Sequence, residues 1–122
     1  MLFMPVKSRS KAPAPKPKVL SDAALEMIAA RFRAYAEPMR LRLLNQLMQG
    51  EATVGQLVEA TGSGQANVSK HLSILREAGL ISTRKVGLST ICIISDPTVN
   101  ELCEIMCRRL QQQLSDNARE FG

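Results

Sequence analysis

The sequence predicts a mainly helical domain that carries one small β-hairpin. Apolar residues recur every three or four positions through most of the chain between residues 21 and 116, which is the spacing of helices with one buried face. Between residues 81 and 95 this spacing gives way to β-branched residues with a glycine near the middle, which is typical of a hairpin. Most boundaries between predicted helices and strands contain a proline or a glycine.

Length and composition suit one cytoplasmic domain. The chain has 122 residues, and 45% of them are hydrophobic but only 3% are aromatic, so we expect one modest aliphatic core. No apolar run reaches the roughly 20 residues that a membrane-spanning helix needs, and the N-terminus does not resemble a secretory signal. Three cysteines are an odd number and do not suggest a disulfide framework. We therefore expect reduced thiols and no membrane partner.

A basic tail precedes the predicted domain. Residues 1–19 hold five basic residues and no acidic one, whereas the rest of the chain holds eleven of each. The tail contains KAPAPKPK, which has too few apolar residues to fold, so we expect disorder. Two interpretations stay open, a solubilising leader and an arm attracted to phosphates. The predicted domain covers residues 20–116, and residues 117–122 are expected to fray.

Two helices are predicted at the start of the domain. Ser21 is a natural N-cap for the first helix, and apolar residues follow it at helical spacing. This helix ends by Glu37, because the residue before a proline disfavours helical backbone. Pro38 suits the first turn of the second helix, and Gly50 is placed to end it.

Two shorter helices follow, with the turn-forming sequence TGSG between them. Thr53 can cap the third helix, and Gln56, three residues on, completes the pattern of a capping box. The fourth helix begins at Ser63 or Gly64, and Gly79 is placed to end it. Its apolar residues recur at i, i+4 and i+7 and face the core, so the polar residues of its first two turns point outward. Those residues are Gln65, Asn67, Ser69, Lys70 and His71.

A hairpin and a long helix complete the domain. The strands are predicted at about residues 81–86 and 89–95, with Arg84 and Lys85 toward the tip. Asp96 can cap the last helix, which carries a wide apolar stripe. This stripe exceeds what one side of a monomer of this size needs to bury, so we expect its excess to meet a partner.

The order helix, helix, helix, turn, helix, hairpin, helix is that of a winged helix-turn-helix domain. In this arrangement the second helix of the pair enters the DNA major groove by its N-terminal end. Asn and Gln can pair with an adenine edge, Ser can bond to bases or phosphates, and Lys and protonated His neutralise phosphate. An ordinary solvated helix face would carry more Glu and Lys. We therefore predict sequence-specific DNA binding through Gln65, Asn67, Ser69, Lys70, His71, Arg84 and Lys85.

Other classes of function fit less well. The chain has one histidine, no acidic pair at helical metal-ligand spacing and no phosphate-binding glycine loop, so we predict that it is not an enzyme. A winged helix that binds only proteins is an alternative, but it would need an acidic or apolar fourth helix. A third interpretation keeps DNA binding and drops any sensor site, so that abundance or a partner protein sets DNA occupancy.

The segment from about residue 21 to residue 112 resembles the ArsR/SmtB family of bacterial winged-helix repressors. The most specific part is SKHLSILREAGL, from Ser69 to Leu80. The resemblance implies a homodimer, paired through its first and last helices, that occupies an imperfectly palindromic DNA operator and leaves it when an effector binds. The interface residues would be Leu25, Ile28, Phe32, Leu102, Met106 and Leu110.

The two best-known metal sites of that family are absent from this sequence. The arsenic-type site would need cysteines where the chain has Thr53 and Gly55. The zinc-type site on the last helix would need histidines at Thr98 and Arg109 and a glutamate at Gln112.

Thiol chemistry remains as a sensing mechanism. Cys103 and Cys107 are four residues apart on the last predicted helix, so their sulfurs could share arsenite or a soft metal ion, with Cys92 as a third ligand. Sulfur or oxidant chemistry at the same pair is the other option. The competing interpretation is that all three cysteines are small buried hydrophobic residues, because each lies in an apolar stretch. No other cofactor is predicted.

Overall fold

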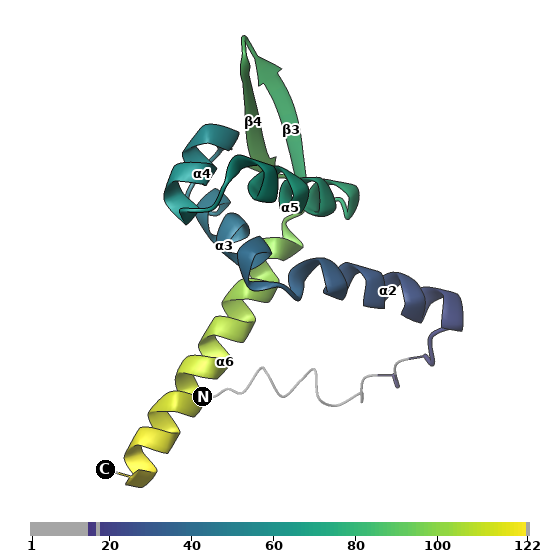
Figure 1. The fold of residues 1–122 in the computed structure, drawn as a ribbon. Coiled ribbons are helices and arrows are strands. Elements are labelled where there is room, and N and C mark those ends of the chain that lie inside the picture. Colours follow the sequence, from purple (N-terminus) through teal and green to yellow (C-terminus); the bar gives the residue numbers. More distant parts are fainter. Residues whose placement is uncertain (1–14, 17, 122) are drawn as a thin grey trace, which may run out of the picture.

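A computed structural model describes residues 15–16 and 18–121 of the protein. Most of the predicted basic tail lies outside the described residues, and its disorder stays a prediction. The elements, in chain order, are α2 (Asp22–Tyr35), α3 (Pro38–Leu47), β2 (Ala52–Thr53), α4 (Val54–Thr61), α5 (Gln65–Glu77), β3 (Ile81–Val86), β4 (Ser89–Ile94) and α6 (Thr98–Phe121) (Figure 1). No helix in this part of the chain is long and apolar enough to cross a bilayer.

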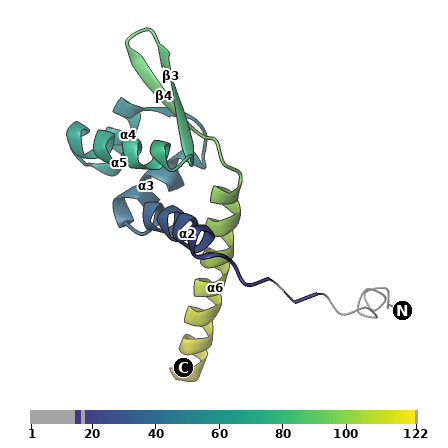
Figure 2. The same cartoon turned by 90° about the vertical axis from the view of Figure 1, so that its right-hand side faces the viewer.

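The core lies where α3, α4 and α5 meet the base of the β3–β4 hairpin (Figure 2). It is aliphatic, as predicted, because leucine, isoleucine and valine supply almost all of its large side chains. The side chains that are almost completely buried are Leu43, Leu44, Leu57, Val68, Leu75, Leu80, Ile81, Cys92 and Val99. This packing fixes one face of α5 against the rest of the domain and leaves the other face to solvent.

The predicted helix caps are present. The Ser21 hydroxyl accepts a hydrogen bond of 3.1 Å from the backbone N–H of Ala24 at the start of α2. At the start of α4, the backbone N–H of Gln56 donates to the Thr53 hydroxyl (3.1 Å), and the backbone N–H of Thr53 donates to the Gln56 side-chain oxygen (2.9 Å). Gly79 follows α5 with a φ of +80°, a conformation that favours glycine.

The sheet has one strand more than predicted. Strand β4 lies between β3 and the two-residue strand β2, and all pairs are antiparallel. Val86 pairs with Ser89, so a two-residue turn joins β3 and β4, and it begins with Gly87 at a φ of +61°. Thr53 pairs with Ile91 in β4. Two residues are too few to show a strand periodicity, so the sequence held no signal for β2.

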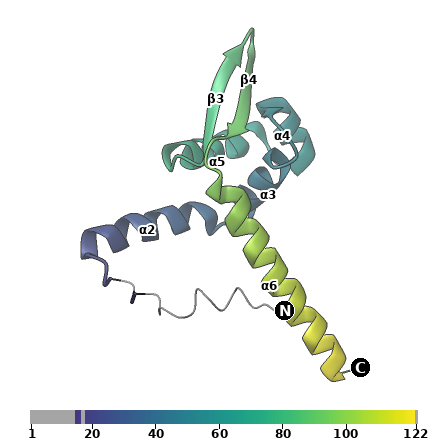
Figure 3. The same ribbon diagram turned by 180° about the vertical axis from the view of Figure 1, so that it is seen from behind.

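Helix α6 begins one residue after Pro97, which follows the predicted cap Asp96 and was expected to be its first residue, and it ends later than predicted. It begins at Thr98, and the Asp96 carboxylate accepts bonds from both the backbone N–H (3.0 Å) and the hydroxyl (2.7 Å) of that residue. It continues to Phe121, beyond residue 116 where we expected the chain to fray, because no proline or glycine interrupts it. Figures 1 and 3 show α2 and α6 extending away from the core, on the side opposite the wing.

Candidate nucleic-acid interface

The first two turns of α5 present small polar side chains to solvent. On the opposite side of this helix, Val68, Leu72 and Leu75 are buried in the core, as predicted. The outward face is therefore fixed by the packing of the helix. The side chains exposed on it are Gln65, Asn67, Ser69 and Lys70.

The N-terminus of α5 has no side-chain cap. Gly64 occupies the N-cap position and offers no acceptor to the first turn. The N–H groups of that turn have no partners within the helix, and the helix dipole adds partial positive charge at this end. Such an end suits a phosphate oxygen, and it lies beside the exposed polar side chains.

Asn67 is oriented by its neighbour. Its side-chain nitrogen donates a hydrogen bond of 2.8 Å to the hydroxyl of Ser63, in the turn before the helix. This bond leaves the Asn67 carbonyl oxygen and one N–H to pair with another group. One donor and one acceptor on the same amide are what an adenine edge in the major groove requires.

His71 does not point outward, which corrects the prediction. Its side chain is 7% exposed, and it is the only buried polar or charged side chain in the part of the chain that the structure describes. The residue lies three positions after Val68 and four before Leu75, which places it toward the buried face of α5. Its ring nitrogen Nδ1 lies 3.1 Å from Nη1 of Arg40 in α3. We therefore do not assign His71 a direct contact with DNA.

Arg40 is a residue that sequence analysis missed. Its guanidinium donates through Nε to the backbone oxygen of Ala34 (2.7 Å) and through Nη2 to that of Arg33 (2.9 Å). Both carbonyls lie at the C-terminal end of α2, where the helix dipole favours a cation. The third partner is His71. These partners are six, seven and 31 residues away in sequence, so no local spacing indicated them.

Glu37 stabilises the start of α3 beside this cluster. Its carboxylate accepts hydrogen bonds from the backbone N–H groups of Met39 (2.6 Å) and Arg40 (3.2 Å). Desolvation alone would raise the pKa of Glu37, but the hydrogen bonds from these two N–H groups and the nearby positive charge of Arg40 outweigh it and hold the pKa below its ordinary value. The carboxylate is therefore ionised at neutral pH.

The two basic residues of the wing differ in their surroundings. Arg84 lies within β3, and its Nη2 is 3.2 Å from a carboxylate oxygen of Glu51, with both side chains about half exposed. Exposed ion pairs of this kind are weak, so a DNA phosphate could compete for the guanidinium. Lys85, one residue closer to the turn, is exposed. The wing thus offers its cations at its outer half.

The three predicted thiols do not form one site. Cys92 is fully buried in β4, between Ala52 and Thr83 of the flanking strands, whereas Cys103 is half-buried and Cys107 is exposed on α6. Among the described residues, no group of three His, Cys, Asp or Glu side chains is arranged to hold a metal ion. The three-thiolate arrangement with Cys92 is therefore not formed within one chain. Only the helical pair remains.

Ionisation of the thiols is also disfavoured. Burial raises the pKa of the Cys92 thiol, and Arg76 lowers it only in part. Burial likewise raises the pKa of Cys103, and the neighbouring Cys107 raises it further. At neutral pH these two thiols are therefore protonated in the absence of a metal ion.

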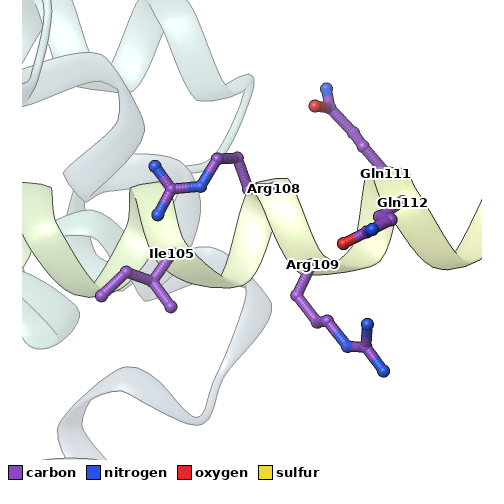
Figure 4. Close-up of a pocket in the computed structure, with 5 residues that line it drawn as sticks. All are labelled: Ile105, Arg108, Arg109, Gln111 and Gln112. Atoms are coloured by element: carbon purple, nitrogen blue, oxygen red, sulfur yellow. The ribbon is translucent and has the colours of Figure 1, made fainter. Parts of the chain in front are cut away.

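Hollows lie along the outer helices α2 and α6. One follows the surface of α6, and Figure 4 shows Arg108 and Arg109 pointing to different sides of the helix, so these side chains enclose no binding site. Another, of about 320 Å³, lies between α2 and α6. It is lined by Met27, Ile28, Arg31, Phe32, Tyr35 and Leu102.

Residues 37–83 match the family model described as bacterial regulatory protein, arsR family. The transcriptional regulator Rv0081 of Mycobacterium tuberculosis is 32% identical over 97 residues, which cover 79% of this chain and 85% of that protein. The chain belongs to the ArsR/SmtB family. The probable mercury resistance operon repressor of Streptomyces lividans is 42% identical over 71 residues, which are 58% of this chain and span 57% of the length of that repressor.

Solved structures of similar proteins share the fold of this ArsR/SmtB-family protein. The crystal structure of Rv0081 aligns with a TM-score of 0.72 at 31% identity, over 80% of this chain and 99% of that one. A solution structure of the homodimeric winged helix-turn-helix domain of Mb0332 from Mycobacterium bovis aligns with a TM-score of 0.72 at 28% identity, over 82% and 95% of the two chains.

These likenesses confirm the predicted fold class and the predicted class of function. Helices α4 and α5 form the helix-turn-helix pair, and β3 and β4 form the wing. The protein is a DNA-binding transcriptional regulator and not an enzyme.

Proposed function

We propose that this ArsR/SmtB-family protein is a homodimeric repressor that binds an imperfectly palindromic DNA operator and is released by a thiophilic effector. The observation that supports DNA reading most directly is the exposed polar front of α5, held outward by buried Val68, Leu72 and Leu75. The name of the Streptomyces lividans relative, a mercury resistance operon repressor, supports both repression and a thiophilic signal.

Each polar group of the interface has a separate role in this proposal. Gln65 and Asn67 pair with base edges, because an amide offers a donor and an acceptor together. Ser69, Lys70 and the uncapped N-terminus of α5 bind backbone phosphates, which fixes the position of the helix in the groove. Lys85 contacts the DNA backbone from the wing, with Arg84 joining it if its pair with Glu51 opens.

Dimerisation is supported by apolar surface that one chain leaves uncovered. Helix α6 contributes Val99 and Cys103 to the packing of the core, but its later turns extend away from the rest of the chain (Figure 3). Six predicted interface side chains on α2 and α6 are between 37% and 59% exposed: Leu25, Ile28, Phe32, Leu102, Met106 and Leu110. A second copy would bury them. Two reading helices related by a two-fold axis then match two half-sites of a palindrome.

The effector site in this proposal is the Cys103 and Cys107 pair. Soft thiolates select thiophilic ions such as mercury or arsenite, and an ion that binds would displace the thiol protons. The pair lies on the helix that we place in the dimer interface, so ligation there could change how the two subunits meet. Sulfur or oxidant chemistry at the exposed Cys107 is the alternative signal.

A second candidate function is a regulator that has no sensor site of its own. Two observations favour it: the raised pKa of Cys103, and the absence of a three-ligand group among the described residues. In that case Cys92 and Cys103 are packing residues, and protein abundance or a partner protein sets operator occupancy.

Selection followed by an effector titration separates these functions. Duplexes are first selected by the full chain from a randomised library. Complexes of the parent and of the Cys103→Ser, Cys107→Ser double variant are then titrated with mercury(II), arsenite, a sulfane sulfur donor and peroxide. We expect one of these to release the parent but not the double variant, while the matched control Cys92→Ala is released like the parent. Release of the double variant at the same effector concentration would contradict the thiol site.

A further inference from the structure

Arg40 lies where three helices meet. It belongs to α3, it donates to two backbone carbonyls at the end of α2, and it contacts His71 of α5. Helix α2 carries part of the apolar surface that we place in the dimer interface, and α5 carries the side chains that we place in the DNA groove. One guanidinium thus connects a helix that we place in the dimer interface with the helix that we place in the DNA groove.

The direction of the Arg40–His71 hydrogen bond determines the protonation state of the histidine. A guanidinium only donates, so Nδ1 of His71 must accept, and its proton must lie on Nε2. A protonated ring carries hydrogen on both nitrogens and offers no acceptor. Protonation would therefore break this bond and place two positive charges 3.1 Å apart.

We propose that the Arg40–His71 pair positions the reading helix relative to α2, so that operator affinity depends on His71 being uncharged. The proposal rests on the DNA-binding function proposed above and adds a positioning pair and proton sensitivity to it. His71 acts through Arg40 and does not touch the DNA. Loss of the bond lets the N-terminal half of α5 move relative to α2, which misplaces Gln65 and Asn67 in the major groove.

Other charged groups near His71 do not replace this partner. Glu37 is the opposing charge, and its carboxylate already binds two backbone N–H groups of α3. Helix α4 carries only Glu59, which is exposed, and in β3 Arg84 pairs with Glu51 while Lys85 is exposed. The other charged residues of α5 itself are Lys70, Arg76 and Glu77, all exposed. Arg40 is therefore the group whose contact depends on the charge of His71.

The test measures a preference ratio against pH. The ratio is the affinity for a duplex selected by the parent from a randomised library, divided by the affinity for a random duplex of equal length. Imidazole changes its charge between about pH 8 and pH 5. Over this range we expect the ratio of the parent to fall by roughly tenfold, which corresponds to loss of one partly buried hydrogen bond. Dividing by the random duplex removes the general effect of pH on phosphate binding.

Two variants test the pair directly. His71→Asn keeps an acceptor near the position of Nδ1 but cannot be protonated in this range, so its ratio should stay constant from about pH 8 to about pH 5. Arg40→Met removes the donor, so its ratio should be low and constant. Arg42→Met removes one exposed positive charge from the same helix and should behave like the parent. Circular dichroism at each pH confirms that each variant is folded.

The outcomes distinguish the inference from the function on which it rests. If the parent shows no preference for any selected duplex at pH 8, the DNA-binding proposal fails. The second outcome assumes that the parent does show a preference. If the preference ratio of His71→Asn, or of a folded Arg40→Met, then decreases as the pH is lowered, to the same extent as the ratio of the parent, the proposed positioning pair is wrong. If His71→Asn does not fold, the Arg40→Met and Arg42→Met pair decides alone.

Discussion

The exposed residues on the front of α5 should separate into two kinds when they are mutated. Gln65→Ala and Asn67→Ala each remove an amide that can pair with a base, so each should weaken specific binding by about 1–3 kcal/mol and relax the sequence preference. Lys70→Ala should weaken binding to all duplexes alike, because it removes a phosphate contact. The slope of log affinity against log salt concentration should become shallower by about one. Titrations of selected and random duplexes at several salt concentrations measure both effects.

Gln111→Ala is the matched control for these variants, because it removes an exposed amide from α6 (Figure 4) and not from α5. It should leave both affinities unchanged. Equal losses for specific and random duplexes in Gln65→Ala and Asn67→Ala would show that these side chains bind the backbone and do not read bases.

The Cys103 thiol should react faster when its neighbour is removed. Burial raises its pKa, and Cys107 raises it further, so the thiolate that attacks an alkylating reagent is scarce at neutral pH. Cys107→Ser removes the second cause, which lowers the pKa and moves the alkylation profile of Cys103 to lower pH. Iodoacetamide rates against pH, followed by mass spectrometry in a Cys92→Ala background, measure this shift. An unchanged profile would mean that the two sulfurs do not interact.

The residues of the interface were predictable only where the deciding contacts are local. Gln65, Asn67, Ser69 and Lys70 follow from the helical period, because burial of one face of α5 places them on the other. Arg40 did not follow, since its partners come from other helices. His71 was misplaced because helical spacing put it at the edge of the apolar face, and its buried ring nitrogen finds its partner in Arg40 of another helix.

Among the helices and strands, α4 offers a test of how much a capping box contributes to stability. Thr53→Ala removes the hydroxyl that accepts from the Gln56 backbone, so the free energy of unfolding should fall by about 1 kcal/mol. Thr53→Ser keeps an acceptor at the same place and should retain most of the stability. Urea unfolding of both variants makes the comparison. A loss in Thr53→Ser as large as in Thr53→Ala would show that the methyl group, and not the cap, stabilises this position.

The helices were predictable because each carries its own boundary chemistry. The residues predicted to start helices lie at or just before the first turn, as expected: Ser21 for α2, Pro38 for α3 and Asp96 for α6. Strand β2 and the far end of α6 were not predictable. The strand pairs with β4 through backbone groups and has only two residues, and no glycine or proline stands near residue 116, where we expected α6 to end.

For the whole molecule, the exposed length of α6 makes dimerisation the central expectation. The helix has 24 residues and is about 36 Å long, and its apolar stripe continues well past its contact with the core. Met106→Glu should place a charge in the dimer interface, give a monomeric mass, and weaken binding to a two-half-site duplex more than to a single half-site. Gln111→Glu, with the same charge on the same helix, should remain a dimer. Sedimentation equilibrium measures the mass, and a monomeric parent at micromolar concentration would contradict the interface.

The small strand β2 has a consequence for the shape of the DNA that this protein can accept. Thr53 pairs with Ile91 of the wing and also caps α4, so the wing is joined directly to the start of the helix-turn-helix. This pairing restrains the wing relative to the start of the helix-turn-helix, so we expect the spacing between α5 and the wing to vary little. A protein with such a fixed spacing binds best to DNA whose groove beside the α5 site already has the matching width. Groove width depends on the base sequence and is narrow in A-tracts, for example. The protein should thus discriminate among flanking base pairs that none of its side chains touches.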